Sequence, residues 1–222
     1  MIGLYVISIL GGLVSMLAAA RVKSTFNKYS KVGVSSGITG AEAAARVMRA
    51  AGVDGVSIEQ HQGFLTDHYD PRAKALRLSP QVYGGRSISA LAVAAHEAGH
   101  AIQDKERYAP LVLRSKLVPA TSFGSKFWML PVFLGIVTGA AGMLYVGIGL
   151  FALVVLFQLV TLPTEFDASA RAKKRLAAAG FVSTPAEEEG VSKVLSAAAM
   201  TYVAAALTAV LQLAYLLMRA RD

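Results

Sequence analysis

The 222-residue sequence contains no cysteine, so it can form neither disulfide bonds nor a thiolate metal site. It also lacks a recognised nucleic-acid-binding motif, although its formal net charge is +8. The cations cluster beside apolar segments, a placement that suits membrane topology and anionic lipid better than nucleic acid. We therefore expect contact with a lipid bilayer and no nucleic-acid partner.

Charged residues are also scarce, at 16% of the chain against 55% hydrophobic residues. This composition is too apolar for an ordinary soluble domain, yet polar stretches interrupt it too often for a chain lying wholly in the membrane. No internal repeat or low-complexity tract is present. The composition predicts a mainly α integral membrane protein with about four transmembrane helices and a small α+β part outside the bilayer.

The apolar segments divide the chain into alternating parts. Residues 1–20 lack the flanking features of a removed signal peptide, so we interpret them as a transmembrane anchor. The basic residues that follow predict that residues 21–126 are a cytoplasmic region. As one helix, residues 127–162 would reach about 54 Å, more than one bilayer thickness. Gly139–Gly142 near their middle favours a transmembrane hairpin, the alternative being one long tilted helix.

The rest of the chain repeats this alternation. Residues 163–195 are polar, and their basic cluster again predicts a cytoplasmic location. Residues 196–222 supply the last transmembrane helix. With the N-terminus outside, four crossings leave Arg219 and Arg221 outside, against the positive-inside rule. We base the expected orientation on the larger basic cluster after residue 20. The protein is thus predicted to be a multi-pass protein of the plasma membrane.

Local signals predict the elements of the α+β part. Thr39 and Glu42 form a capping-box pattern ahead of a helix. The stretches Gly63–Thr66 and Ala75–Leu78 flank the turn-prone pair Asp70–Pro71, which favours a β-hairpin. The strand around Leu76 to Ser79 is also a candidate for pairing with an extended substrate.

One motif carries chemistry. A helix predicted to run from Ser87 or Ser89 through Asp104 contains the pattern H-E-x-x-H, formed by His96, Glu97 and His100. Histidines four residues apart share one helix face and can hold one zinc ion, and the glutamate between them can act as general base. The alternative is a pair of core histidines beside a surface glutamate.

A catalytic zinc requires a third protein ligand and one open position. No histidine follows His100, so the candidates are Glu165, Asp167 and the upstream histidines His61 and His68. Glu165 can also be explained as a charge at a helix N-terminus. His100 and Glu165 reach the same side of a membrane only if the chain crosses an even number of times between them, which a two-helix hairpin satisfies.

The sequence resembles the bacterial membrane zinc metallopeptidases of the YugP-like family. The similar segments are Gly63–Pro71, Leu78–Ser79 with Val82–Tyr83, Ala92–Gln103, Glu165–Ser169 and Ala197–Val203. More distantly, the order of zinc-motif helix, two membrane helices and glutamate is similar to that of HtpX-type and CAAX-type membrane proteases. Their Glu-aromatic-x-Ala-Asp segment supplies a glutamate ligand, which Glu165 matches, whereas Ser169 stands where they have aspartate. The resemblance implies proteolysis.

We therefore expect a membrane zinc metalloendopeptidase with a zincin-like, gluzincin-type catalytic part facing the cytoplasm. Zn²⁺ would be held by His96, His100 and Glu165, with Glu97 as general base. The substrates would be membrane or membrane-associated proteins. The candidates for a transition-state stabiliser are His68, Tyr69, Tyr83 and Arg171. For His68, the role of a turn residue bonded to its own backbone is an equal alternative.

Two other classes compete with this interpretation. One is a site-2-type intramembrane metalloprotease, with the zinc motif inside a membrane helix. The other is a non-catalytic, zinc-bound membrane scaffold. The alanine-rich stretch 197–209 can in addition pack closely against another helix, so a homo-oligomer is a further expectation.

Overall fold

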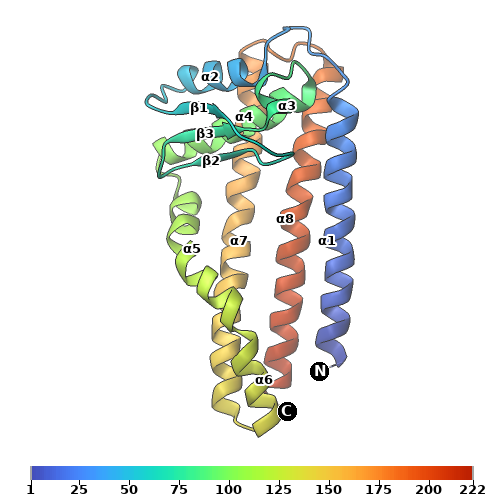
Figure 1. Ribbon diagram of the computed structural model, residues 1–222, viewed down its shortest axis with the longest axis vertical. Coiled ribbons are helices and arrows are strands. Elements are labelled where there is room, and N and C mark those ends of the chain that lie inside the picture. The colour runs from blue at the N-terminus through green and yellow to red at the C-terminus, as the bar shows by residue number, and fades with distance from the viewer. Residues whose placement is uncertain (1, 222) are drawn as a thin grey trace. The chain divides into compact units, whose positions relative to one another are not determined.

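The computed structural model describes residues 2–221, most of which are helical (Figure 1). The predicted fold class is confirmed, because the described chain combines long helices with one small sheet. In chain order the elements are α1 (Ile2–Tyr29), α2 (Gly40–Ala50), β1 (Ser57–Gln60), β2 (His68–Asp70), β3 (Ala75–Leu78), α3 (Pro80–Tyr83), α4 (Ile88–Lys105), α5 (Ala109–Phe127), α6 (Met129–Thr138), α7 (Ala141–Ala178) and α8 (Pro185–Arg219).

Four helical stretches are long and apolar enough to cross a membrane, which is the predicted number. They are Gly3–Tyr29, Ala109–Thr138, Ala141–Ala178 and Pro185–Arg219. Each is longer than the uncharged segment that predicted it, and the second begins at Ala109, so that it includes Arg114, Lys116 and Pro119. The turn between the two central stretches lies where it was predicted. Gly139 ends α6 there with a φ of 72°, a left-handed conformation that glycine adopts without strain.

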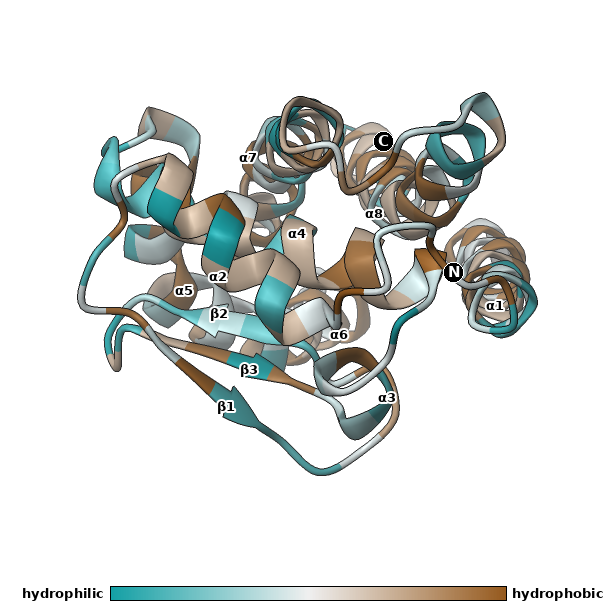
Figure 2. Ribbon diagram, turned by 90° about the horizontal axis from the view of Figure 1, so that it is seen from above, coloured by the Kyte–Doolittle hydropathy of each residue, from teal (hydrophilic) through white to brown (hydrophobic). Residues whose placement is uncertain are grey.

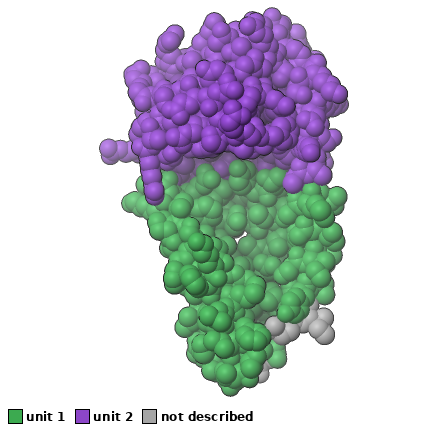
Figure 3. All heavy atoms as spheres, viewed as in Figure 1, with its two compact units in different colours: residues 1–18, 112–163, 200–222 green, residues 19–111, 164–199 purple. Residues whose placement is uncertain are grey.

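The chain divides into two compact units (Figure 3). The first, which we call the apolar unit, contains residues up to 18, residues 112–163 and residues from 200 onward. The second, which we call the α/β unit, contains residues 19–111 and 164–199. Each unit has its own cluster of buried hydrophobic side chains. The zinc-motif helix α4 belongs to the α/β unit.

The sheet of the α/β unit has the order β1-β3-β2, with β1 parallel and β2 antiparallel to β3. The predicted hairpin therefore exists, but its first strand is His68–Asp70 and not Gly63–Thr66. Gly63 and Leu65 have φ values of 119° and 56°, so that stretch cannot be extended. The expected pairing of β3 with a substrate is also wrong, because β1 and β2 occupy both of its edges.

Helices α2 and α4 form the core of the α/β unit. The capping box of Thr39 and Glu42 begins α2 as predicted, and Figure 2 shows hydrophilic and hydrophobic bands along this helix. Ser87 caps α4, its hydroxyl accepting from the Ala90 N–H at 3.2 Å. Ser89, the other predicted cap, instead donates to the Phe26 carbonyl at 2.8 Å. Both contacts fix the start of the helix that carries the zinc motif.

Candidate metal centre

Helix α4 presents the two histidines of the motif on one face, as their spacing requires. His96 and His100 have ring centroids 4.8 Å apart at an interplanar angle of 85°. Most of α4 is buried, with small side chains around the motif. Such a surrounding lets a neighbouring helix come close to the histidines.

That neighbour is α7. A β-carbon at Gly99 would lie 2.8 Å from the carbonyl oxygen of Ala168, so only glycine permits this approach. It brings Glu165, of which 2% is exposed, to the histidine pair. Its Oε2 lies 3.1 Å from His96 Nε2 and 3.6 Å from His100 Nε2. The three residues form a buried group whose ligand atoms all lie within 4.8 Å of one another.

These separations fit a zinc ion. With metal–ligand distances near 2.0–2.1 Å, neighbouring ligand atoms of a tetrahedral site are about 3.4 Å apart. The two distances from Glu165 Oε2 to the imidazole nitrogens bracket that value. Two imidazoles and one carboxylate are also a donor set found in catalytic zinc sites, where the fourth position stays open.

A buried amide orients His100. The Nε2 of Gln103 donates to the Thr164 carbonyl and to Asp167 Oδ2, both at 2.8 Å. Its Oε1 is therefore the atom that faces His100 Nδ1, at 2.9 Å, and it accepts the Nδ1 proton. This bond leaves the Nε2 lone pair of His100 directed towards Glu165 and available to a metal.

Ser169 lies beside His96. Its hydroxyl is 3.1 Å from His96 Nδ1 and can accept the Nδ1 proton, which leaves the Nε2 of this ring for a metal. A serine thus occupies the position of the aspartate in the distantly similar proteases and keeps a contact to the imidazole. Asp167, the rival third ligand, instead bonds Gln103 and pairs with Arg171.

The charges around His100 favour a cation. Burial alone would lower the pKa of this imidazole, but its hydrogen bond to the Glu165 carboxylate and the nearby charges of Glu97 and Glu165 outweigh burial and raise the pKa. A site that stabilises a proton on buried imidazole also stabilises a metal ion in its place. Metal and proton therefore compete for the same nitrogen.

Glu97 is held by the sheet. Its Oε2 accepts the backbone N–H of Tyr69 at 3.0 Å, and 9% of the residue is exposed. The free edge of β2 thus fixes the carboxylate beside the two histidines. The Tyr69 hydroxyl donates to Asp104 at 2.6 Å, and burial together with this bond raises the pKa of the phenol.

The other proposed site residues do not join the cluster. His68 Nδ1 lies 2.8 Å from the Thr66 carbonyl, the turn-type contact that was the alternative to a catalytic role. The pairing of His68 with Arg77 puts it on the sheet face opposite to that of Tyr69. His61 packs against the ring of His68, at 5.5 Å between centroids. Tyr83 packs on the hydrophobic core of the α/β unit, and Arg171 pairs with two carboxylates.

Sequence reasoning missed Gln103, although a signal was present. It stands three residues after His100, on the same helix face, and is a polar residue in an otherwise apolar stretch of α4. Its contact with Thr164 was not foreseeable, since the approach of α7 depends on tertiary packing. A fully buried amide with all its partners satisfied marks a residue that holds two helices in register.

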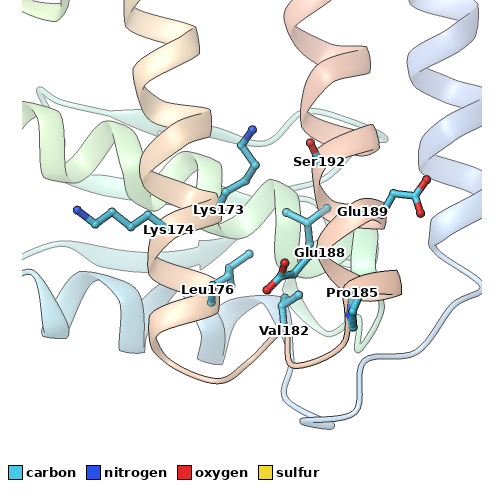
Figure 4. A pocket seen from close by; sticks show the side chains of 10 residues that line it. Lys173, Lys174, Leu176, Val182, Pro185, Glu188, Glu189 and Ser192 are labelled. Carbon is cyan, nitrogen blue, oxygen red and sulfur yellow. The ribbon is translucent and has the colours of Figure 1, made fainter.

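A separate cavity of about 570 Å³ lies between α7 and α8 (Figure 4). Lysines and a leucine of α7 line one side, and glutamates of α8 line the other: Lys173, Lys174, Leu176, Glu188 and Glu189. None of the three grouped ligands lines it, so this cavity is distinct from the metal centre.

Four candidate membrane helices and a buried His-His-Glu group define the class as membrane zinc peptidases. The chain belongs to the family described as "Putative neutral zinc metallopeptidase", whose pattern matches residues 4–221. It is 51% identical over 199 residues to the "Putative membrane protease YugP" of Bacillus subtilis (strain 168), covering 90% of this chain and 88% of that protein. No solved structure matches it.

Proposed function

We propose that the protein is a zinc metalloendopeptidase that hydrolyses peptide bonds of membrane or membrane-associated proteins at the cytoplasmic face of the plasma membrane. One observation carries this proposal. Ligand atoms of His96, His100 and Glu165, from two helices, lie within 4.8 Å of one another. The carboxylate of Glu97 stands on the same helix as the two histidines and is fixed by a backbone N–H.

The residues of the site supply the remaining steps. Zinc held by His96, His100 and Glu165 would lower the pKa of a water molecule towards about 7 and polarise the scissile carbonyl. Glu97, placed by the Tyr69 N–H, would take a proton from water and pass it to the leaving amine. Gln103 and Ser169 keep the Nε2 atoms of both histidines directed at the metal.

The two rival classes fit less well. Helix α4 is not among the four candidate membrane spans in residues 2–221, which favours a zinc motif outside the bilayer over a site-2-type arrangement. A non-catalytic scaffold has no use for a carboxylate held beside the metal ligands, as Glu97 is.

The choice of third ligand is testable by comparing Glu165→Ala with Asp167→Ala. We expect Glu165→Ala to weaken zinc binding by more than about 100-fold and to abolish peptide cleavage, because it removes a ligand atom. Asp167→Ala removes only a contact to Gln103, and we expect a loss of about tenfold or less. Competition with a chromophoric chelator measures both affinities. Unaltered affinity in Glu165→Ala would refute this ligand set.

The proposed orientation can be measured with single cysteines, because the natural chain contains none. Asp54 lies exposed in the α/β unit, and Ala140 lies in the turn after α6. We expect a membrane-impermeant maleimide to label Ala140→Cys in intact spheroplasts and Asp54→Cys only after lysis. The cysteine-free parent is the control, and the reverse labelling pattern would contradict the cytoplasmic assignment.

A further inference from the structure

Lys126 of helix α5 lies beside the long uncharged part of helix α7 in the apolar unit. Helix α5 packs on α7 at Gly124, where a β-carbon would lie 2.7 Å from the Leu150 carbonyl oxygen. Helix α7 carries no charge from Ala141 to Thr164, about 36 Å at 1.5 Å per residue. Leu150 is about 14 Å from the start of this run. Lys126, two residues beyond Gly124, is therefore about 11 Å inside one end and about 25 Å inside the other.

The side chain of Lys126 faces away from α7. Two residues turn an α-helix by about 200°, which puts Lys126 opposite the buried Gly124. Lys126 is exposed, as are Ser122 and Ser125 at helical spacing on the same face. Two aromatic rings, Phe123 and Phe127, flank this face with 57% and 48% of their surface exposed. We call Ser122, Ser125 and Lys126 the α5 polar face.

Nothing in the described chain neutralises this charge. Within residues 2–221 the Lys126 ammonium makes no hydrogen bond and no ion pair. The described residues of the apolar unit also include no aspartate or glutamate. The described residues of a second copy of the apolar unit would therefore offer Lys126 no carboxylate, which argues against self-association through this face.

Lys126 lies farther from either end of the uncharged run than its side chain reaches. A lysine side chain extends roughly 6 Å, less than the distance to the nearer end of the apolar run. The Cα–Cβ bond in a helix tilts towards the helix N-terminus, and α5 enters from the side that is about 25 Å away. The ammonium is thus directed away from the nearer surface. Ionisable residues at such depth are retained where a partner pairs with them.

We propose that the α5 polar face docks a transmembrane helix of a substrate protein, and that this helix carries a carboxylate within the bilayer. Lys126 pairs with the carboxylate, while the two serine hydroxyls and the adjacent rings contact the rest of the incoming helix. That the docked protein is a substrate depends on the proposed peptidase function. That a helix docks here depends only on the charge of Lys126 and its position on α5.

The test uses the Glu97→Gln protein in phosphatidylcholine vesicles, with an acceptor dye on an added Ala140→Cys. Two donor-labelled synthetic helices of leucine and alanine differ only in a central aspartate or leucine. We expect energy transfer to report about tenfold tighter binding of the aspartate helix. Lys126→Leu should remove this preference, and Lys126→Arg should retain it. Lys116→Leu, an exposed lysine nearer the start of α5, is the matched control and should also retain it.

Equal binding of the two helices, or a preference that survives Lys126→Leu, would overturn the proposal. Loss of the preference when phosphatidylglycerol is added would also overturn it, in favour of an anionic lipid at this face. The assay measures binding and needs no cleavage, so equal binding of the two helices would not contradict the peptidase function. Conversely, helix binding can be measured even if the protein cleaves no peptide.

Discussion

Glu97→Gln is expected to lower kcat/KM for peptide hydrolysis by about 10²–10⁴-fold while zinc stays bound. The glutamine keeps the size of the side chain, and its Oε1 can still accept the Tyr69 N–H. It cannot take a proton from water, so the general-base step is lost. None of the three ligand residues changes. Cleavage of a fluorogenic peptide by detergent-purified protein, with zinc per chain measured by mass spectrometry, gives both quantities.

Glu188→Gln is the matched control for this change. It makes the same substitution at an exposed glutamate of α8, outside the metal centre, and should leave cleavage as it was. Unchanged cleavage in Glu97→Gln would end the general-base assignment. In cells, the Glu97→Gln variant should cause a membrane protein to accumulate relative to the wild type, and this protein is the physiological substrate. A zinc-bound scaffold would give identical proteomes in the two strains.

Elements set by local patterns were predictable from the sequence. The capping box at Thr39 and the cap at Ser87 fix helix starts through contacts three residues away. The turn at Gly139 depends on a backbone conformation that glycine adopts readily. The number of apolar helices likewise follows from the uncharged lengths together with the glycine turn that divides the central segment.

Features that depend on positive φ at a residue other than glycine, or on distant segments, were not predictable. Gly63–Thr66 has the composition of a strand, yet Leu65 adopts a left-handed conformation and breaks it. Strand β1 pairs in parallel with β3, although β2 lies between them in the sequence, and no local pattern predicts this pairing. The expected pairing of β3 with a substrate failed for this reason.

The metal centre shows the same division. The motif on α4 places His96, Glu97 and His100 by helical spacing, which sequence alone supplies. Four residues remained candidates for the third ligand, and the packing of α7 against Gly99 brings Glu165 to the histidines. The contacts of Gln103 with Thr164 and of Ser169 with His96 depend on that packing and have no local signature.

His96→Ala is expected to reduce bound zinc from about one per chain to background. The variant leaves His100 and Glu165, and two ligands are too few for a catalytic zinc site. It also removes the 3.1 Å partner of Glu165, which is 2% exposed, so the buried carboxylate keeps only the contact with His100. Ser169→Ala is the graded comparison. It keeps the ligand but removes the contact that orients it, for which we expect a loss of about 10–100-fold in affinity.

Thermal unfolding distinguishes loss of metal from loss of fold. Zinc binds the native wild type, so excess zinc should raise its Tm in proportion to the logarithm of zinc concentration over Kd. Ser169→Ala should follow the same dependence at 10–100-fold higher zinc, in line with its weaker affinity. His96→Ala should unfold cooperatively at a Tm that zinc does not change. Full zinc content or an unaltered zinc-dependent Tm in His96→Ala would show that the metal, if bound, lies elsewhere than on α4.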